Sequence, residues 1–394
     1  GVAVGDDRAD SGRAGASAAA AFGSTFAVFG VAYSFGAFFD SMSEEFDSGR
    51  GETALLFSLT TFLYFVLGLA TGRWSDRVGP RPVLLTGAVA MLVGLWATAL
   101  ADSLRVGLAT YALGGGSAVA CGYVPMVARV GGWFERRRTL ALGVAVAGSG
   151  LGTLVMAPVS SWLIDQHGWR TAYRILAVGA TAILLVCAVV ARRAPVDAGG
   201  DEIPPLSKTA RDPAFRTLFG SALLMSLSLF VPFVFLVEYA EESGVDSGPA
   251  ALLVGLIGGS SIVGRLALGT FAPRLGLTRI YQGCFATMGV SFLVWWAADD
   301  RYAVLVLFAV VLGVAYGGFI ALSPAVAAQL FGPVGLGGIL GFLYTSAGVG
   351  GLVGPPVAGA VIDARGYPTV IVAAAVLTFG AFAVLLRLPR DPTR

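Results

Sequence analysis

The sequence predicts an all-α membrane protein of twelve transmembrane helices arranged in two similar halves. Three observations predict this class: an apolar composition, a regular succession of long apolar stretches, and an internal repeat. The chain is 56% hydrophobic and 13% charged over 394 residues, whereas soluble domains average about 25% charged residues. Most of the chain is therefore expected to be solvated by lipid.

The apolar stretches are long enough to be spanning helices. The segment Val83–Ala101, for example, carries no charge, and about 20 apolar residues cross a bilayer as a helix. Polar breaks separate the stretches, as expected for loops. The predicted helices are 16–39, 53–71, 83–101, 105–128, 139–163, 172–191, 216–240, 250–272, 278–298, 302–322, 337–361 and 367–387.

The longest interior polar break, 192–215, contains Pro195, Pro204 and Pro205 and divides the chain near its middle. Such a segment is typical of a linker. The sequence therefore predicts a tail over 1–15, an N-terminal six-helix half over 16–191, a cytoplasmic linker over 192–215 and a C-terminal half over 216–394. No cleavable leader is expected before the first helix, because no short apolar region with a cleavage site precedes it.

Basic residues are distributed asymmetrically between alternate loops. With a cytoplasmic N-terminus, 19 of the 26 Lys and Arg residues fall in inside segments and 6 in outside segments, with Arg265 left within a helix. Cytoplasmic loops of membrane proteins carry the excess of positive charge. Both termini are therefore expected in the cytoplasm.

The two halves repeat at a nearly constant offset. Gly72-Arg-Trp-Ser-Asp-Arg-Val-Gly79 aligns with Gly269-Thr-Phe-Ala-Pro-Arg-Leu-Gly276 at an offset of 197. A second block, at 198, pairs residues 150, 152, 158, 165, 168 and 169 with 348, 350, 356, 363, 366 and 367. Two parallel six-helix repeats can rock about a central pathway, which is the architecture of a secondary transporter.

The segment Gly72-Arg-Trp-Ser-Asp-Arg-Val-Gly-Pro-Arg81 resembles the signature loop between the second and third helices of the major facilitator superfamily. Its glycines permit a tight turn. Its charges, Asp76, Arg77 and Arg81, can pair with one another or with helix C-termini at the cytoplasmic face. The resemblance implies a gating role for these three residues.

Further segments resemble the monocarboxylate transporter family. They are Tyr123-Val-Pro125, Trp133-Phe-Glu-Arg-Arg-Arg138, Leu140 to Gly148, Tyr33-Ser-Phe-Gly-Ala-Phe-Phe39 and Gly354-Pro-Pro-Val-Ala-Gly359. The likeness extends over nearly the whole chain. The acidic-glycine-aromatic motif that opens the first helix of animal members is missing, which favours a prokaryotic branch.

Arg265 is the ionisable residue that fits neither a loop nor a helix edge. A charge within the membrane costs at least about 2.5 kcal/mol and is a functional candidate. Arg265 lies four residues before Gly269, so snorkelling to the cytoplasmic surface is the alternative. The resemblance favours function, because related transporters place an arginine here that binds the substrate carboxylate, a group that a guanidinium can grip bidentately.

The proton pathway is less well defined. Animal members carry an aspartate one turn before this arginine, where this chain has Ser261. Glu238 is the proton-coupling candidate in the C-terminal half, although its place near a helix end also suits a solvated edge residue. His167, the single histidine, is expected to be a surface residue of an outer loop.

The other substrate-binding candidates are polar or aromatic residues that interrupt apolar helices. Tyr33 aligns with a substrate-linked lysine of animal members, and Cys121 and Tyr123 fall where prokaryotic relatives place ligand-facing side chains. Each position is also compatible with helix packing. The set is Tyr33, Cys121, Tyr123, Tyr316, Tyr344 and Ser346.

No cofactor, metal or nucleotide is expected. The three cysteines are far apart and lack metal-site spacing. The glycine runs 114–116 and 148–152 lie in apolar helices without the strand and Lys-Ser/Thr of a phosphate loop. A net charge of +2 gives no reason to expect nucleic acid.

The favoured function is secondary transport of a small monocarboxylate such as lactate or pyruvate across the plasma membrane. Proton symport is the favoured coupling, and alternating access is the expected mechanism. The alternatives are an oxalate/formate-type anion exchanger and a drug effluxer of the same fold. The former is expected to need a second cation in the eleventh helix, which is missing. A membrane-embedded enzyme or sensor is the remote alternative, and the sequence makes no prediction about an accessory subunit.

The charge asymmetry generates a topological prediction. A cysteine introduced between Arg192 and Asp212 should react with an impermeant thiol reagent only from the cytoplasm. A cysteine next to Asp300 should react only from outside. Labelling of intact cells and of inverted vesicles measures both, and the reverse pattern would show that the orientation is wrong.

Overall fold

The computed structural model describes residues 12–133, 138–191, 206–331 and 336–389, and these ranges contain helices and short connections but no strand. The N-terminal half comprises α1 (Gly12–Tyr33), α2 (Phe35–Glu45), α3 (Arg50–Val78), α4 (Pro80–Ala99), α5 (Leu104–Thr110), the π-helix η1 (Tyr111–Gly115), α6 (Gly116–Gly122), α7 (Val124–Trp133) and α8 (Arg138–Val190). The C-terminal half comprises α9 (Leu206–Arg211), α10 (Pro213–Leu229), α11 (Val231–Glu242), α12 (Ser247–Leu275), α13 (Leu277–Trp296), α14 (Tyr302–Phe331), α15 (Leu336–Arg365) and α16 (Tyr367–Leu385).

Consecutive helices combine into the twelve expected spans. The first span is α1 with α2, the fourth runs from α5 to α7, and the seventh is α10 with α11. Helix α8 contains the fifth and sixth spans, because Gly168 interrupts it with a non-helical φ of 78°. The predicted break at 164–171 was therefore too wide, since the helix continues up to this glycine.

Nine stretches of the described residues are long and apolar enough to cross a membrane. One of them, Gly143–Val190, contains the two spans on either side of Gly168. The fourth span is divided among four short helices, and the ninth, α13, also has membrane-spanning length at 20 residues. The whole set is that of a multi-pass membrane protein.

The internal repeat recurs in the backbone. Gly79 and Gly276 have φ values of 88° and 101°, and Gly168 and Gly366 have 78° and 81°. These pairs are separated by the offsets of 197 and 198 found in the sequence. Positive φ is the region that favours glycine, so the repeated glycines mark repeated turns between successive spans.

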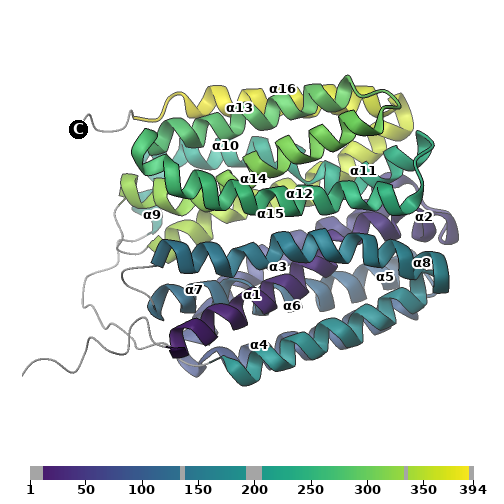
Figure 1. Cartoon of the computed structure of the whole chain (residues 1–394), viewed down its shortest axis with the longest axis horizontal. Helices are drawn as coiled ribbons and strands as arrows, with labels where there is room; N and C mark the ends of the chain where they lie inside the picture. Colours follow the sequence, from purple (N-terminus) through teal and green to yellow (C-terminus); the bar gives the residue numbers. More distant parts are fainter. Residues whose placement is uncertain (1–11, 134–137, 192–205, 332–335, 390–394) are drawn as a thin grey trace, which may run out of the picture.

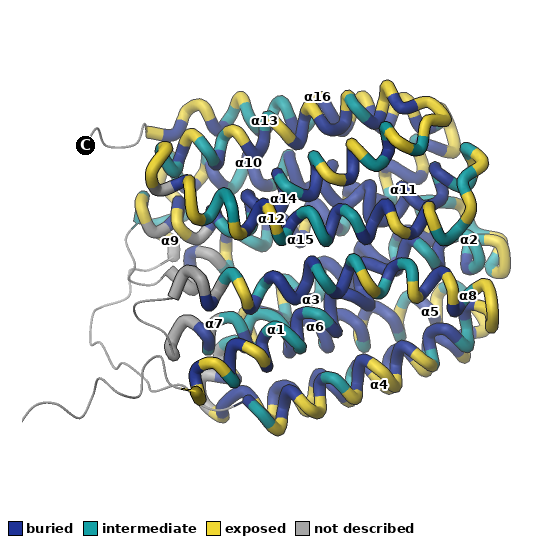
Figure 2. Tube along the Cα trace, viewed as in Figure 1, coloured by how far each residue is buried: buried dark blue, intermediate teal, exposed yellow. Residues whose placement is uncertain are grey.

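The halves pack side by side with their helices roughly parallel (Figure 1). Helix α3 packs along α15, and α8 packs along α12. Exposed positions concentrate on the surfaces turned away from this interface (Figure 2). Large apolar side chains are among them, including Val89 at 62%, Val189 at 71% and Val376 at 65% exposure, as expected for a surface that faces lipid tails.

We call the two ends of the helix bundle the inner end and the outer end. The inner end contains Gly12 and Leu385 and lies at the left of Figure 1. The outer end contains Glu45 and the turns at Gly168 and Gly366, at the right. The charge distribution predicts that the inner end faces the cytoplasm.

Glycines allow the helices to approach closely, as in other membrane bundles. A Cβ at Gly264 of α12 would lie 2.0 Å from the Val314 carbonyl oxygen of α14. A Cβ at Gly317 of α14 would lie 2.0 Å from the Ser261 carbonyl oxygen. Between the halves, a Cβ at Gly150 of α8 would be 2.5 Å from the Gly258 oxygen of α12. Backbone contact of this kind leaves no room for a methyl group.

The α12–α14 crossing generates a stability prediction. Gly264→Ala should destabilise the protein by about 1–3 kcal/mol, because two backbones must separate to admit the methyl group. Gly283→Ala on α13 is the control, since nothing lies within 4 Å of its added Cβ and alanine favours a helix by about 0.5–1 kcal/mol. Melting temperatures of the purified variants measure the difference, and equal values would contradict the predicted contact.

Candidate functional site

Arg265 lies inside the protein and not at the membrane surface. It is 4% exposed, and its guanidinium crosses from α12 to α8 of the other half. Nη1 donates hydrogen bonds to the Val146 carbonyl oxygen and, at 2.9 Å, to Ser149 Oγ. The snorkelling alternative is therefore wrong for the described structure.

Among the described residues, the remaining edge of the guanidinium forms no hydrogen bond. Nε is buried without a hydrogen-bond partner, and within the described ranges no carboxylate forms an ion pair with Arg265. The Tyr316 ring lies 5.8 Å from Cζ, within the range of a cation–π interaction. A buried cation with one unused edge is suited to binding an external anion.

Aromatic side chains from both halves surround this region. Tyr33 of α1 stacks on Phe233 of α11 with ring centroids 4.4 Å apart. The hydroxyl groups of Tyr33 and Tyr316 are 3.4 Å apart. Arg265, Tyr33 and Tyr316, three of the predicted site residues, are thereby brought to one place where the halves meet.

Tyr33, Phe233 and Tyr316 form an aromatic wall beside Arg265. Tyr123 and Tyr64 extend this wall, because both rings pack against Phe29. The Tyr123 ring lies 4.9 Å and the Tyr64 ring 5.8 Å from Phe29, both edge to face. Tyr64 is 2% exposed, and within the described part of the chain its hydroxyl forms no hydrogen bond. The sequence reasoning missed Tyr64, although a tyrosine in an apolar helix is the same signal that selected Tyr123. It also missed Ser149, which lies in the glycine run 148–152 that was considered only as a possible phosphate loop.

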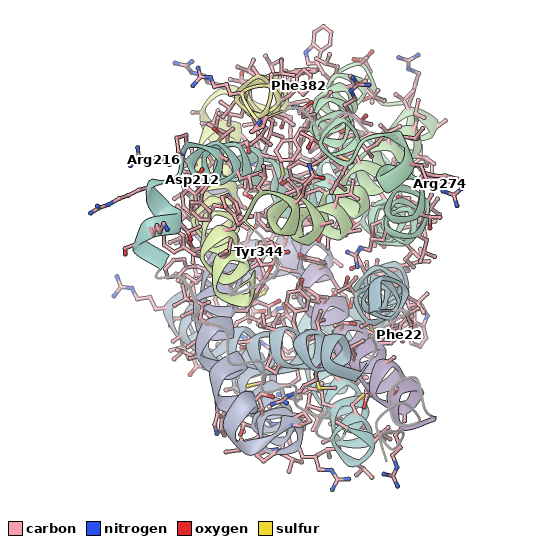
Figure 3. The ribbon with its side chains drawn as sticks, turned by 90° about the vertical axis from the view of Figure 1, so that its left-hand side faces the viewer. Phe22, Asp212, Arg216, Arg274, Tyr344 and Phe382 are labelled. Carbon is pink, nitrogen blue, oxygen red and sulfur yellow. The ribbon has the colours of Figure 1, made fainter. Side chains whose placement is uncertain are left out.

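Tyr344 lies between the halves towards the inner end. Its ring centroid is 6.3 Å from that of Phe65 on α3, and the view from the inner end places it near the middle of the molecule (Figure 3). In the same view Arg216 and Arg274 point outwards from the edges. Tyr344 therefore lies on the side of α15 that faces the N-terminal half.

Cys121 and Ser346 make other contacts. Cys121 packs on α4, where a Cβ at Gly87 would be 2.8 Å from its Cβ. The Ser346 hydroxyl donates to the Leu343 carbonyl of its own helix. Both are buried, and neither is joined to Arg265 or to the tyrosines by a described hydrogen bond. Helix packing, the alternative for each, accounts for these contacts.

Glu238 belongs to a charged cluster at the outer end of the bundle. Glu238 is 6% exposed, so it is not a solvated edge residue. Arg50 of α3 donates to it from Nε at 2.9 Å, and Tyr367 of α16 donates from its hydroxyl at 2.8 Å. Arg50 is one of the six basic residues counted in outside segments, and its ion pairs could not be recognised from sequence because the partners are far away in the chain.

Arg50 joins the two halves. Besides Glu238 it binds Asp363 of α15, at 2.8 Å from Nη1, and Glu242 of α11. The repeat-related contact is Ser247 Oγ donating to Asp165 Oδ2 at 2.8 Å. Both contacts cross between the halves and hold the outer end closed.

The signature loop is described only in part. The side chains of Asp76 and Arg77 lie outside the described residues, so their gating role stays a prediction. Arg81 donates from Nε to the Ala191 carbonyl at 3.1 Å and from Nη2 to the Val189 carbonyl at 2.8 Å. It therefore caps the end of α8 within its own half.

His167 is exposed beside Trp162, at a centroid distance of 6.4 Å, as expected for a surface residue, but it lies in α8 and not in a loop. Among the described residues, no group of three or more His, Cys, Asp or Glu side chains could hold a metal ion.

Two six-helix halves that meet at a buried polar site define a membrane transporter of the parallel-repeat class. The sequence matches the family model of the Major Facilitator Superfamily over residues 21–300 and again over 218–394. The chain belongs to this superfamily.

The chain is also similar to individual transporters within this superfamily. The chain is 30% identical to "Monocarboxylate transporter 13" of Rattus norvegicus, over 94% of this chain and 87% of the relative. It is 32% identical to "Monocarboxylate transporter 12-B" of Danio rerio, over 84% and 77%. It is 27% identical to "MFS-type transporter pynF" of Aspergillus niger, over 92% and 85%. The chain is thus homologous to monocarboxylate transporters, and it is a transporter and not an enzyme.

The contact between Arg265 and α8 generates a prediction. Ser149→Ala should lower the melting temperature, because a hydrogen bond to a charged group contributes about 1.5–3 kcal/mol. Ser160→Ala on the same helix is the control, since Ser160 Oγ is buried without a partner. Thermal unfolding without added ligand measures both, and equal losses would contradict the described bond.

Proposed function

We propose that the protein is a secondary active transporter of small monocarboxylates of the lactate and pyruvate type, with Arg265 as the carboxylate anchor. The observation that carries this proposal is a buried guanidinium with no carboxylate partner among the described residues. A buried charge is costly unless it is paired. A substrate carboxylate would supply the missing counter-charge.

The hydrogen bonds of Arg265 favour a bidentate contact. Val146 and Ser149 occupy Nη1, which leaves Nε and the adjacent Nη2 to face a carboxylate. Two parallel N–H···O bonds of this kind are typical of arginine–carboxylate recognition. The anchor would thus be oriented before the substrate arrives, which lowers the entropic cost of binding.

The aromatic wall favours a small organic acid. Tyr33, Tyr316 and Phe233 present ring faces together with hydroxyl groups, and Tyr64 adds a hydroxyl without a partner. These groups suit a short apolar chain that carries a hydroxyl or keto oxygen. A doubly charged substrate such as oxalate would need a second cation, and the outer Arg50 is already engaged by three carboxylates.

We further propose that transport is symport with protons by alternating access, in the plasma membrane, with both termini cytoplasmic. A monocarboxylate carried with one proton moves without net charge. Ser261 cannot supply the proton, and its hydroxyl donates to the Gly258 carbonyl at 2.6 Å. The proton acceptor would therefore lie elsewhere, which directs attention to Glu238.

Arg265→Ala should weaken monocarboxylate binding by about 30-fold to several thousand-fold, because loss of a buried charge partner costs about 2–5 kcal/mol. Arg265→Lys should restore little, since an ammonium lacks the planar fork. Arg274→Ala on the same helix is the matched control, because Arg274 is exposed.

The measurement is the affinity of purified protein for lactate, pyruvate, oxalate and lipophilic cations, with melting temperature as the folding control. Unchanged lactate and pyruvate affinity in folded Arg265→Ala would remove the anchor. Preferential binding of oxalate or of lipophilic cations by the wild type would replace the proposed substrate class. Counterflow in proteoliposomes then tests transport of the acid that binds.

A further inference from the structure

One of the two described contacts between the halves at the outer end is formed by a single cation, Arg50. Arg50, on the N-terminal half, faces Glu238, Glu242 and Asp363, all on the C-terminal half. Its backbone N–H also donates to Asp363 Oδ2 at 3.2 Å. When the outer end opens, α3 carries Arg50 away from all three carboxylates together.

Glu238 is the buried member of this group. Its side chain is 7% exposed, compared with 49% for Glu242 and 40% for Asp363. Arg50 occupies Oε1 and Tyr367 occupies Oε2. Tyr239 covers Tyr367 edge to face at 5.0 Å. Water can therefore solvate the two rim carboxylates more readily than it can solvate Glu238.

The surroundings of Glu238 are otherwise acidic. Asp40 of α2 and Glu241 of α11 interact electrostatically with it, in addition to Glu242 and Asp363. Among the described groups that face Glu238, Arg50 supplies the positive charge and Tyr367 a neutral donor. Without Arg50, an ionised Glu238 would be a shielded carboxylate among other carboxylates.

We propose that Glu238 is the proton-binding residue of an outer gate: it closes the gate as a carboxylate bound to Arg50 and takes up a proton when the gate opens. In the open gate the proton, in place of the guanidinium, neutralises the negative charge of Glu238. Tyr367 lies on the same half as Glu238 and keeps its hydrogen bond to the carboxyl group. The O–H bond forms with a proton from the outside solution, and the Arg50–Glu238 ion pair breaks.

The sign of the pH effect follows from linkage. The open state binds one more proton than the closed state, so lower pH favours opening, by up to about tenfold in the opening constant per pH unit. At neutral or alkaline pH the ion pair favours closure. A proton gradient directed inwards would then favour opening on the acidic side.

The repeat-related contact lacks this property. An offset of 197 relates Arg50 to Ser247, so the second contact is a neutral hydroxyl donating to Asp165. Glu45, the counterpart of Glu242, is bound by Arg170 and Trp169 of its own half. Of the two outer contacts related by the repeat, one therefore has a cation, Arg50, between the halves, and the other has the neutral hydroxyl of Ser247.

Helix α11 connects the gate to the central site. It carries Glu238 at the gate and Phe233, which stacks on Tyr33 beside Tyr316. Movement of this helix away from the N-terminal half would release Arg50 and the Tyr33 ring together. The proton and the substrate would thus act on the same moving element.

The test measures opening directly and needs no substrate, so a wrong substrate assignment does not affect it. Val237 is 3% exposed and faces α2, because a Cβ at Gly36 would be 3.3 Å from its Cγ2. Val237→Cys, with Cys121, Cys187 and Cys284 replaced by alanine, places a reporter thiol between the halves. The rate of maleimide labelling in nanodiscs, divided by the rate for an exposed Ala297→Cys thiol, reports opening.

The normalised rate should rise by about tenfold or more from about pH 8 to about pH 5. Glu238→Gln should raise the rate at about pH 8 and reduce the pH dependence to less than about threefold, because the amide cannot ionise. Glu242→Gln is the matched control on the same helix and should keep the wild-type dependence. Arg50→Gln should also open the gate at all pH values.

A flat wild-type profile would overturn the proposal, as would an unchanged pH dependence in Glu238→Gln. If Glu242→Gln alone lost the pH dependence of labelling, the proton would bind at the exposed Glu242, and the proposal would also be overturned. Size-exclusion chromatography verifies folding of each variant. If Glu238→Gln does not fold, Arg50→Gln decides, since retention of the wild-type profile without the guanidinium contradicts the ion-pair gate.

Discussion

A guanidinium buried between two helical halves is the interaction on which the rest of the structure depends. Burying a charge away from water is costly, and Arg265 meets that cost only in part, through Val146, Ser149 and the Tyr316 ring. All the hydrogen bonds described for it cross to the other half. The cation is therefore tied to the relative position of the halves as well as to any anion that enters between them.

The helix packing makes this arrangement possible. Gly150 and Gly258 allow α8 and α12 to approach within backbone contact, and this closeness lets a side chain on α12 reach a carbonyl of α8. Between membrane helices, small residues replace the hydrophobic driving force with close van der Waals contact. Side chains of α8 also pack into this interface, since Thr153 lies against Gly258 and Leu154 against Gly259.

The outer cluster and the central site each contain a guanidinium, but they differ in the number of carboxylates around it. At the outer end a guanidinium is surrounded by excess carboxylate, whereas at the centre a guanidinium lacks one. Solvent explains the difference: Glu242 and Asp363 are partly exposed and can remain ionised in water, while Arg265 is enclosed. The two proposals follow this difference: an anion would bind at the enclosed Arg265, and a proton would bind at Glu238, the buried carboxylate of the outer cluster.

The sequence by itself determined the class of fold, the number of spans and the repeat. These depend on apolar length and on local glycine turns, and the positive φ values of Gly79 and Gly276 recur as the alignment implied. It also selected Arg265, because a charge in an apolar helix is visible without any neighbour. Only the tertiary structure decided that Glu238 is buried against Arg50, that Cys121 packs on α4, and that Ser149 and Tyr64 belong to the central site. The physical reason is that these properties arise from contacts between residues tens to hundreds of positions apart, on helices whose relative rotation local sequence does not specify.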